Sequence, residues 1–323
     1  MKKLLRIFRN YSFVNAVGRG LIKSSSSTNY RISQRLKLFW PVSGTVLIKK
    51  KNFSFKLKSE GNDALSNKLY YEANWEDETI YLLKALVPKA KVFFDVGANI
   101  GVFSLLAEQF NPNTTIYCFE PNPINVNRIK ANLIANNSKN TNLVSKAIGE
   151  KKGQLEFYVP NGNYTSDVSS FYNAHTKDFN DFGTKAINVE VISLDEFVLE
   201  NKEAPDLIKM DIELFEYQAL KGSLNLLREE NPVIIIELFN DVVKRAINPA
   251  LNDELEKDLT LKTEKLLADL GYHFYLISTK GLLHIQNLTS NADSSMYLLT
   301  KEVLSKTFYL QSEYEELSNE LFH

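Results

Sequence analysis

One stretch of ten residues decides the fold, and it reads Val92-Phe93-Phe94-Asp95-Val96-Gly97-Ala98-Asn99-Ile100-Gly101. Residues 92–95 read as a buried strand that ends on an acid, and the chain from Val102 onward reads as the start of a helix. The glycine loop between them permits close backbone approach, while the free N–H groups of the first helical turn point at whatever lies above the strand. The junction therefore predicts a binding site for a small charged ligand.

The spacing of the glycines indicates which ligand. Gly97 and Gly101 stand four apart, whereas a dinucleotide fingerprint reads G-x-G-x-x-G and a P-loop adds a Lys-Ser/Thr pair. Asp95 would repel a pyrophosphate but suits a ligand with an ammonium group, such as S-adenosylmethionine. The next strand, 115–119, ends at Glu120, where a doubly wound fold places the acid that holds both ribose hydroxyls. A nicotinamide-dependent dehydrogenase is therefore disfavoured.

Each of these features also has a plain structural reading. The two glycines by themselves suit an ordinary strand-to-helix turn, Asp95 suits a cap, and Glu120 suits a solvated strand end. Their order and spacing together favour a nucleoside site.

Three motifs in succession resemble the signatures of the FkbM family of S-adenosylmethionine-dependent methyltransferases. They are residues 95–101 (DVGANIG), 119–123 (FEPNP) and 207–216 (LIKMDIELFE), and the resemblance covers about residues 70–300. It implies an α/β fold with a Rossmann-like, seven-stranded class I methyltransferase sheet, mostly parallel with an antiparallel edge hairpin. It also implies a set of cofactor-binding residues, namely Asp95, Gly97, Ala98, Asn99, Gly101, Glu120, Pro121 and Asp211.

The chain departs from the family pattern at one position. The family usually has glycine after Asp-x-Glu, where this sequence has Leu214. We expect a side chain there to narrow the pocket beside the transferred methyl group, which affects the acceptor more than the cofactor.

Three charges at the end of an apolar strand are the candidate catalytic residues. Lys209, Asp211 and Glu213 follow one another at period two, so they share one face near the end of strand 206–211. A hydroxyl acceptor needs a base, because it is a poor nucleophile while protonated. We expect Asp211 beside the methionine moiety or the acceptor hydroxyl, Glu213 as the alternative base, and Lys209 as their neutralising partner. The other reading is a salt-bridged strand end that leads into a helix.

The predicted acceptor-binding residues lie in three other segments. Glu237 closes the apolar strand 232–237, and ligands in such sheets bind at strand carboxyl ends. Trp75 and Glu76 suit a sugar ring and its hydroxyl, although a packing Trp is the commoner case. Ser170 lies in the long polar loop 161–183, which is typical of a lid or of a mobile insertion.

Composition narrows the partners and the compartment. A single cysteine, Cys118, fits a reducing compartment, and we expect a cytoplasmic protein. Residues 1–60 carry 14 Lys and Arg and one acid, whereas the remainder carries 24 basic and 38 acidic residues. An acidic body argues against nucleic acid. The four histidines are scattered, so no metal is indicated. The basic segment 1–11 suits either an anionic inner-membrane surface or an arm on the acidic body.

The order of predicted elements divides the chain into four parts. These are a basic arm and linker (1–40), a β-hairpin extension (41–75), a methyltransferase domain (76–300) and a C-terminal helix (301–323). Within them we expect hairpin strands at 44–48 and 53–57, a helix over 77–87, single elements at 142–148 and 214–228, and a helix over 301–322 able to pack on a second subunit.

The leading hypothesis is an O-methyltransferase that transfers a methyl group to a hydroxyl of a glycan, glycolipid or secondary metabolite. A methyltransferase fold that has lost catalysis and serves as a binding module is the alternative.

Overall fold

The computed structural model describes residues 12–24, 40–50, 53–61, 64–72, 74–161, 169, 183–238, 259–288, 295–306, 308 and 314–322. The basic segment 1–11, the linker from residue 25, and Ser170 with most of its loop lie outside the described residues.

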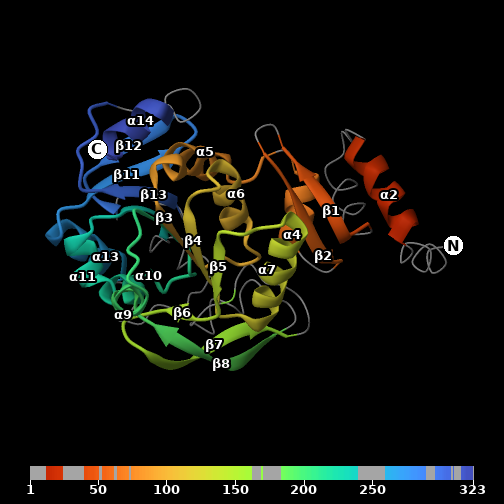
Figure 1. The fold of residues 1–323 in the computed structure, drawn as a ribbon, viewed down its shortest axis with the longest axis horizontal. Coiled ribbons are helices and arrows are strands. Elements are labelled where there is room, and N and C mark those ends of the chain that lie inside the picture. The colour runs from red at the N-terminus through yellow and green to blue at the C-terminus, as the bar shows by residue number, and fades with distance from the viewer. Residues whose placement is uncertain are drawn as a thin grey trace.

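A mixed sheet of eight strands forms the centre of the described structure, in the order β12-β11-β13-β10-β9-β3-β4-β5 (Figure 1). Five strands run parallel: β3 (Val92–Val96), β4 (Thr115–Phe119), β5 (Thr141–Val144), β9 (Leu207–Met210) and β10 (Val233–Leu238). Three antiparallel strands follow at one edge: β11 (His273–Ser278), β12 (Gly281–Ile285) and β13 (Ser295–Thr300). The sequence predicted seven strands and did not foresee β12, which pairs with the outer side of β11.

Alternation along the parallel strands sends neighbouring side chains into two separate cores. In β3, Phe93 belongs to one core and Phe94 to the other, and in β9 Leu207 and Ile208 divide in the same way. All four are at most 1% exposed. Because both faces of these strands are buried, their sequences are continuously apolar rather than alternating. The sheet therefore needs a layer of other elements on each face.

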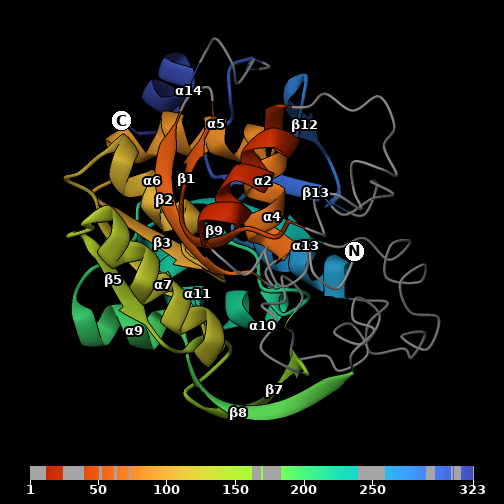
Figure 2. The same cartoon turned by 90° about the vertical axis from the view of Figure 1, so that its right-hand side faces the viewer.

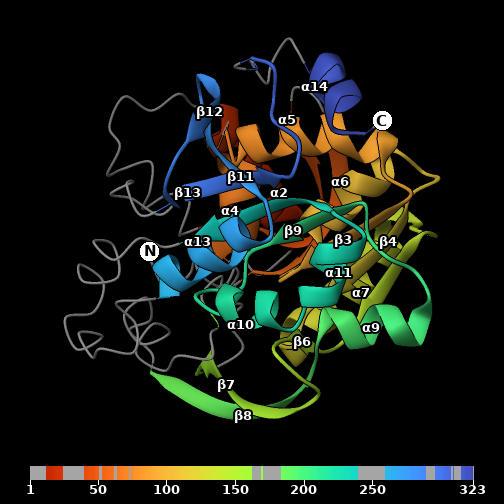
Figure 3. The same ribbon diagram turned by 90° about the vertical axis from the view of Figure 1, so that its left-hand side faces the viewer.

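Helices cover both faces. One core contains residues of α5 (Asp77–Leu86) and α6 (Val102–Phe110), and the other contains residues of α9 (Leu194–Asn201), α10 (Glu216–Lys221), α11 (Leu224–Glu229) and α13 (Leu259–Asp269). Figure 3 shows α9, α10, α11 and α13 together in front of the sheet. The helix predicted over 77–87 ends at Leu86 and continues as a 3₁₀ turn, Val87–Lys89, because Pro88 cannot donate the next helical hydrogen bond.

The N-terminal elements lie on the side of the described structure that faces the viewer in Figure 2, and the second strand of their hairpin packs beside α7 (Pro123–Asn136). They are α2 (Ser12–Ser24), the antiparallel strands β1 (Ser43–Lys49) and β2 (Ser54–Glu60), and α4 (Ala64–Tyr71). The Oδ1 atoms of Asn132 and Asn136 accept the backbone N–H groups of Lys58 and Lys56, both at 2.8 Å. These bonds tie the edge strand β2 to α7. Helix α4 was not predicted from the sequence.

A second sheet, β6-β8-β7, adjoins the central one. Its strands are β6 (Ala147–Ile148), β7 (Gly153–Pro160) and β8 (Thr184–Ile192). The single strand predicted at 142–148 is thus two strands in different sheets, because the chain turns between them and the Lys146 N–H bonds to the Val144 carbonyl at 2.8 Å.

Two predicted helices are shorter than expected. The helix at 214–228 is interrupted at Gly222, where a Cβ atom would lie 2.1 Å from the Gly149 carbonyl oxygen. Asp195 then accepts the N–H groups of Asn225 and Leu226 and so begins α11 separately.

The C-terminal helix α14 spans Tyr314–Leu321 rather than 301–322. Its apolar residues Leu317 and Leu321 are buried in the core that contains α5. These two apolar residues of the helix are therefore used within this chain. Within the described residues, no helix is long and apolar enough to cross a membrane.

Candidate active site

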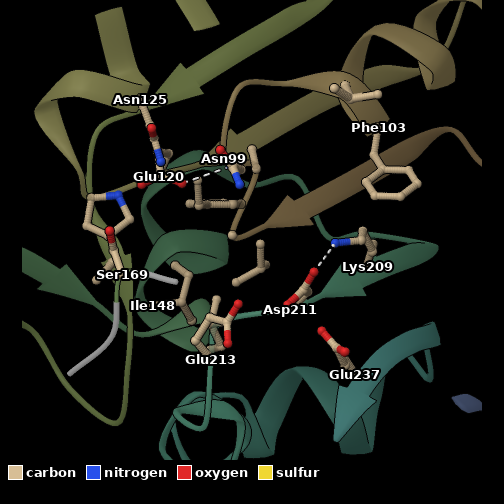
Figure 4. Close-up of a pocket in the computed structure, with 18 of the residues that line it drawn as sticks. Asn99, Phe103, Glu120, Asn125, Ile148, Ser169, Lys209, Asp211, Glu213 and Glu237 are labelled. Carbon is tan, nitrogen blue, oxygen red and sulfur yellow. Dashed lines mark hydrogen bonds and ion pairs between the residues drawn. The ribbon is translucent and has the colours of Figure 1, made fainter. Parts of the chain in front are cut away.

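A cavity of about 200 Å³ opens at the carboxyl ends of β3, β4, β9 and β10 (Figure 4). Most of the residues predicted from the sequence line it: Trp75, Glu76, Gly97, Ala98, Asn99, Glu120, Pro121, Lys209, Asp211, Glu213 and Glu237. Asp95 and Gly101 are not among the described residues that do so. The ends of the parallel strands thus bring together residues that are 140 positions apart in the sequence, Gly97 and Glu237, as expected for a doubly wound sheet.

The glycine loop is held against both neighbouring strands. Gly97 has φ +82°, and a Cβ atom built on it would lie 1.9 Å from the Asp211 carbonyl oxygen. The N–H groups of Gly97 and Ala98 both donate to the Phe119 carbonyl at 3.0 Å. The first glycine is therefore required by the close approach of β3 and β9, and these two N–H groups are already used within the fold.

Asp95 lies inside the fold rather than on the cavity wall. Its side chain is 0% exposed, and its Oδ2 accepts the Ser104 hydroxyl of α6 at 2.6 Å. Burial raises the pKa of Asp95, against the opposing effects of Lys209 and Ser104. Strand alternation is the reason for this position, because Asp95 shares the face of Phe93 and so points toward α6. A direct contact between Asp95 and a cationic ligand, as the sequence suggested, is not what this geometry offers.

The Glu120 carboxylate connects β4 to the glycine loop. Its two oxygens accept the backbone N–H groups of Asn99 (2.9 Å) and Asn122 (2.8 Å), and the Asn125 side chain bonds to it as well. Burial raises the pKa of Glu120 to about 7, even though these hydrogen bonds lower it. A carboxylate has about four acceptor positions, so Glu120 keeps capacity for a donor on a ligand.

A cluster of charged side chains, Lys209, Asp211 and Glu237, lies at the ends of β9 and β10. The Lys209 ammonium group is 3.1 Å from Asp211 Oδ2 and 4.5 Å from the Phe103 ring centroid. Burial lowers the pKa of Lys209, but the carboxylates of Asp211, Asp95 and Glu76 raise it more, so the pKa lies above its ordinary value. This lysine is therefore a permanent buried cation.

The carboxyls of Asp211 and Glu237 point toward each other (Figure 4) and share a hydrogen bond. Burial raises the pKa of Asp211, but Lys209 and these hydrogen bonds lower it more, and the net shift is downward. Asp211 is thus held ionised in the cavity.

The chain after Asp211 adopts an unusual backbone. Glu213 and Leu214 have φ of +54° and +78°, a region that favours glycine. Glu213 lines the cavity, whereas Leu214 lines a separate hollow with Leu238 and Thr263. The expectation that Leu214 narrows the main pocket is therefore wrong, because the left-handed turn directs its side chain to the other side.

Trp75 and Glu76 reach the cavity from the segment that precedes α5. Trp75 is 6% exposed and stacks on Phe103, with ring centroids 5.2 Å apart. Glu76 has φ +44° at the start of α5, and burial raises its pKa to about 7. The Trp ring is thus mainly a packing residue, and the acid beside it faces the cavity.

Sequence reasoning missed several residues of the cavity wall. Lys68 comes from α4, Asn125 from α7 and Phe157 from β7. Ser169, which also lines the cavity, belongs to the polar loop 161–183 that the sequence placed over the site. Of the first three, only Asn125 had a sequence signal, since it follows the FEPNP motif by two residues. Among the described residues, no group of three or more His, Cys, Asp and Glu is placed to hold a metal ion.

Three buried oxygen atoms of the wall have no hydrogen-bond partner within the described structure: Glu76 Oε2, Asn99 Oδ1 and Asn125 Oδ1. All three are acceptors, and unpaired buried acceptors are costly. A ligand rich in donors, with ribose hydroxyls, an exocyclic amine and an ammonium group, matches this wall. The residues present therefore fit S-adenosylmethionine.

The sequence is similar to a family of methyltransferases and to individual members of it. Residues 95–274 match the model of the methyltransferase FkbM domain. The chain is 25% identical over 194 residues to the hexuronic acid methyltransferase AglP of Haloferax volcanii, covering 56% of this chain and 72% of that protein. It is 27% identical over 157 residues to the 31-O-demethyl-FK506 methyltransferase FkbM of Streptomyces tacrolimicus, and the match covers 41% of this chain and 58% of that protein.

Among solved structures, the chain resembles the methyltransferase FkbM from Methylobacillus flagellatus KT. The TM-score is 0.42 at 16% identity, and the match covers 88% of this chain and 58% of that one. Because the domain model spans more than half of the sequence, the chain belongs to the FkbM family of methyltransferases.

Proposed function

We propose that this methyltransferase uses S-adenosylmethionine to methylate a hydroxyl group of a glycan, a glycolipid or a secondary metabolite. The observation that carries the cofactor half of the proposal is the set of unpaired acceptors on the cavity wall, together with Glu120 at the end of β4. The acceptor class is supported by the relatives, one of which is named for a hexuronic acid and another for FK506.

Glu120 would hold the ribose hydroxyls. Its carboxylate is fixed by backbone N–H groups from two sides, so it loses little conformational freedom when a ligand binds. Asn125 hydrogen-bonds Glu120, and its Oδ1, which has no partner within the described structure, would accept a bond from a ligand donor. When bound, S-adenosylmethionine supplies an electrophilic methyl group on a sulfonium.

The residues around Asp211 would serve the acceptor. Methyl transfer depends chiefly on placing the acceptor oxygen in line with the methyl group, and a carboxylate assists by accepting the hydroxyl proton. Asp211 is held ionised by Lys209 and so is a good hydrogen-bond acceptor but a weak base. Glu213 lines the same part of the cavity and is the further proton acceptor, whereas Glu237 lies beside Asp211 (Figure 4).

Calorimetric titration tests the cofactor half of this proposal. We expect S-adenosylhomocysteine to bind and NAD⁺ not to bind, and the reverse result would refute the proposal. Conversion of S-adenosylmethionine that depends on an added hydroxyl compound tests the catalytic half. With such an acceptor, Asp211→Asn and Glu213→Gln should each lower turnover, and full turnover in both would place the base elsewhere.

The alternative of a non-catalytic binding module loses its main support. That reading depended on Leu214 and on the N-terminal hairpin as signs that the site has drifted, and Leu214 lines a different hollow. Any acceptor-dependent methyl transfer excludes the module.

A further inference from the structure

The position of Glu76 is not explained by folding. It occupies the left-handed region with φ +44° at the start of α5, where its side chain makes no capping hydrogen bond. Its Oε2 is buried on the cavity wall with no hydrogen-bond partner among the residues that the structure describes. Backbone strain and an unpaired buried oxygen both oppose folding, and they persist mainly where function requires them.

The charges that act on Glu76 place it on the β9 side of the cavity. They come from Lys209 and Asp211 of the β9 end, Lys68 of α4 and Asp95 of β3. Lys209 is already paired with Asp211 at 3.1 Å. Burial raises the pKa of Glu76 to about 7, so without a ligand it is about half protonated at neutral pH. A second cation placed beside Glu76 would ionise it completely.

Glu120 and Glu76 mark two sides of one cavity. Glu120 ends β4, and Glu76 faces the end of β9, with β3 between these two strands. A nucleoside whose ribose lies on Glu120 would extend any substituent at its 5′ carbon across β3 toward Glu76. The acid that the sequence offered for a cationic substituent, Asp95, is 0% exposed and bonded to Ser104.

Lys68 supplies the complementary charge. It lines the same cavity and is near enough to influence Glu76 electrostatically, and its residue is exposed. One acid and one separate lysine match an α-amino acid zwitterion, whose ammonium and carboxylate groups share one carbon. A plain sugar hydroxyl would use only one of the two charges.

We propose that Glu76 and Lys68 together bind the amino-acid end of S-adenosylmethionine, with Glu76 on the ammonium group and Lys68 on the carboxylate. This inference rests on the proposed function. Both residues precede the segment that matches the family model, which begins at residue 95. Helix α4 and the start of α5 therefore complete the cofactor site.

Comparing the binding of two nucleosides isolates the contribution of the amino-acid group. S-adenosylhomocysteine carries the amino-acid group, whereas 5′-methylthioadenosine keeps the adenosine and the thioether and lacks that group. Calorimetry of both ligands, in buffers of different ionisation enthalpy, gives the affinity and the number of protons released. Glu120 also has a pKa of about 7, so its protonation can change when either ligand binds. That change adds equally to the proton release of both ligands, and subtracting one release from the other removes it.

We expect S-adenosylhomocysteine to release more protons than 5′-methylthioadenosine. The difference should be about 0.9 proton at pH 6, about 0.5 at pH 7 and about 0.1 at pH 8, because a group with a pKa of about 7 is ionised by binding. An equal release by the two ligands at all three pH values would overturn the inference. This measurement uses the unaltered protein and does not depend on the folding of a variant.

Substitutions at the two residues test the same inference through ligand affinity. Glu76→Gln should weaken S-adenosylhomocysteine binding about 10- to 100-fold and abolish the extra proton release, while 5′-methylthioadenosine binds as before. Lys68→Met should weaken the same ligand about 3- to 10-fold, since its side chain is more exposed. Glu78→Gln, which removes a carboxylate from the same helix away from the cavity, is the matched control and should change neither affinity.

The outcomes separate this inference from the proposed function. If neither nucleoside binds, the proposed function fails. If both bind and Glu76→Gln weakens them equally, or weakens neither, the cofactor site stands and the role of Glu76 is refuted.

Discussion

The ammonium group of Lys209 lies 3.1 Å from Oδ2 of Asp211, two residues further along the chain, with only 2% of the lysine side chain exposed. Period two places both side chains on one face of the strand end. The negative charges of Asp95 and Glu76 also raise the pKa of Lys209. One buried cation therefore offsets the charge of three acids. The acidic cavity depends on this lysine for its stability.

Lys209→Met should therefore destabilise the protein by about 3–5 kcal/mol, because it leaves buried carboxylates without their cation. Urea unfolding at pH 7.5 measures this loss. The matched control is Lys221→Met, which removes the partially exposed pair with Glu150 and should cost less than about 1 kcal/mol. Similar losses in the two variants would show that Lys209 does not compensate the buried acids.

Gly97 and Gly101 have the same φ of +82° but different surroundings. A Cβ atom on Gly97 would lie 1.9 Å from a backbone oxygen of Asp211, whereas one on Gly101 would lie 3.4 Å from the Ile129 side chain. Gly97→Ala should cost at least about 3 kcal/mol of unfolding free energy, and Gly101→Ala about 1–2 kcal/mol from the backbone alone. Equal costs in urea unfolding would contradict the close approach of β3 and β9.

Leu214 is buried in a left-handed conformation, so its side chain stabilises the fold while its backbone is strained. Comparing the unfolding free energies of Leu214→Gly and Leu214→Ala isolates the cost of the left-handed backbone, since both variants remove the leucine side chain beyond Cβ. We expect the Gly variant to be the more stable by about 1 kcal/mol, the opposite of the order in a helix. The same pair at Leu220, within α10, should show Ala more stable than Gly by about 1 kcal/mol. An Ala preference at both positions would exclude the strain.

Glu216 should make stability fall as the pH rises. Burial, with a smaller effect of Asp211 and Glu213, raises its pKa from the ordinary 4.5 to about 8. Between these values the native state keeps a proton that the unfolded state has lost, so the group contributes most below pH 4.5 and loses that contribution up to about pH 8.

Glu216→Gln keeps an acceptor for the Ile212 N–H and removes the titration. The slope of unfolding free energy against pH, measured between pH 5 and pH 8, should become less negative by up to about 1.4 kcal/mol per pH unit. Glu229→Gln, on the exposed end of α11, serves as control and should leave the slope unchanged. An unchanged slope in Glu216→Gln as well would mean that Glu216 is ionised throughout.

Local sequence patterns predicted the parts of the fold that depend on local structure. The strand before Gly97, the helix after Gly101 and the strands ending at Glu120 and Glu237 were predicted to within a residue or two, because apolar runs and breakers mark them. The edge strand β12, the helix α4 and the division of 142–148 were not predicted. These depend on which distant strand or helix is available for pairing, and no short window of sequence contains that information.

The candidate site shows the same division. Glu120, Asp211 and Glu213 were predicted to lie together because the carboxyl ends of parallel strands meet. Asp95 was expected to meet the ligand, but it is 0% exposed and bonded to Ser104, a partner that becomes apparent only when α6 packs on β3. Lys68 carried no signal, because the helix that bears it was itself unforeseen.

The most direct test of the central claim is a crystal structure of the protein with S-adenosylhomocysteine. Our account predicts the nucleoside in the cavity between β3, β4 and β9, with its ribose hydroxyls within hydrogen-bond distance of the Glu120 carboxylate. S-adenosylhomocysteine bound outside this cavity, or bound in it with the ribose away from Glu120, would contradict the account.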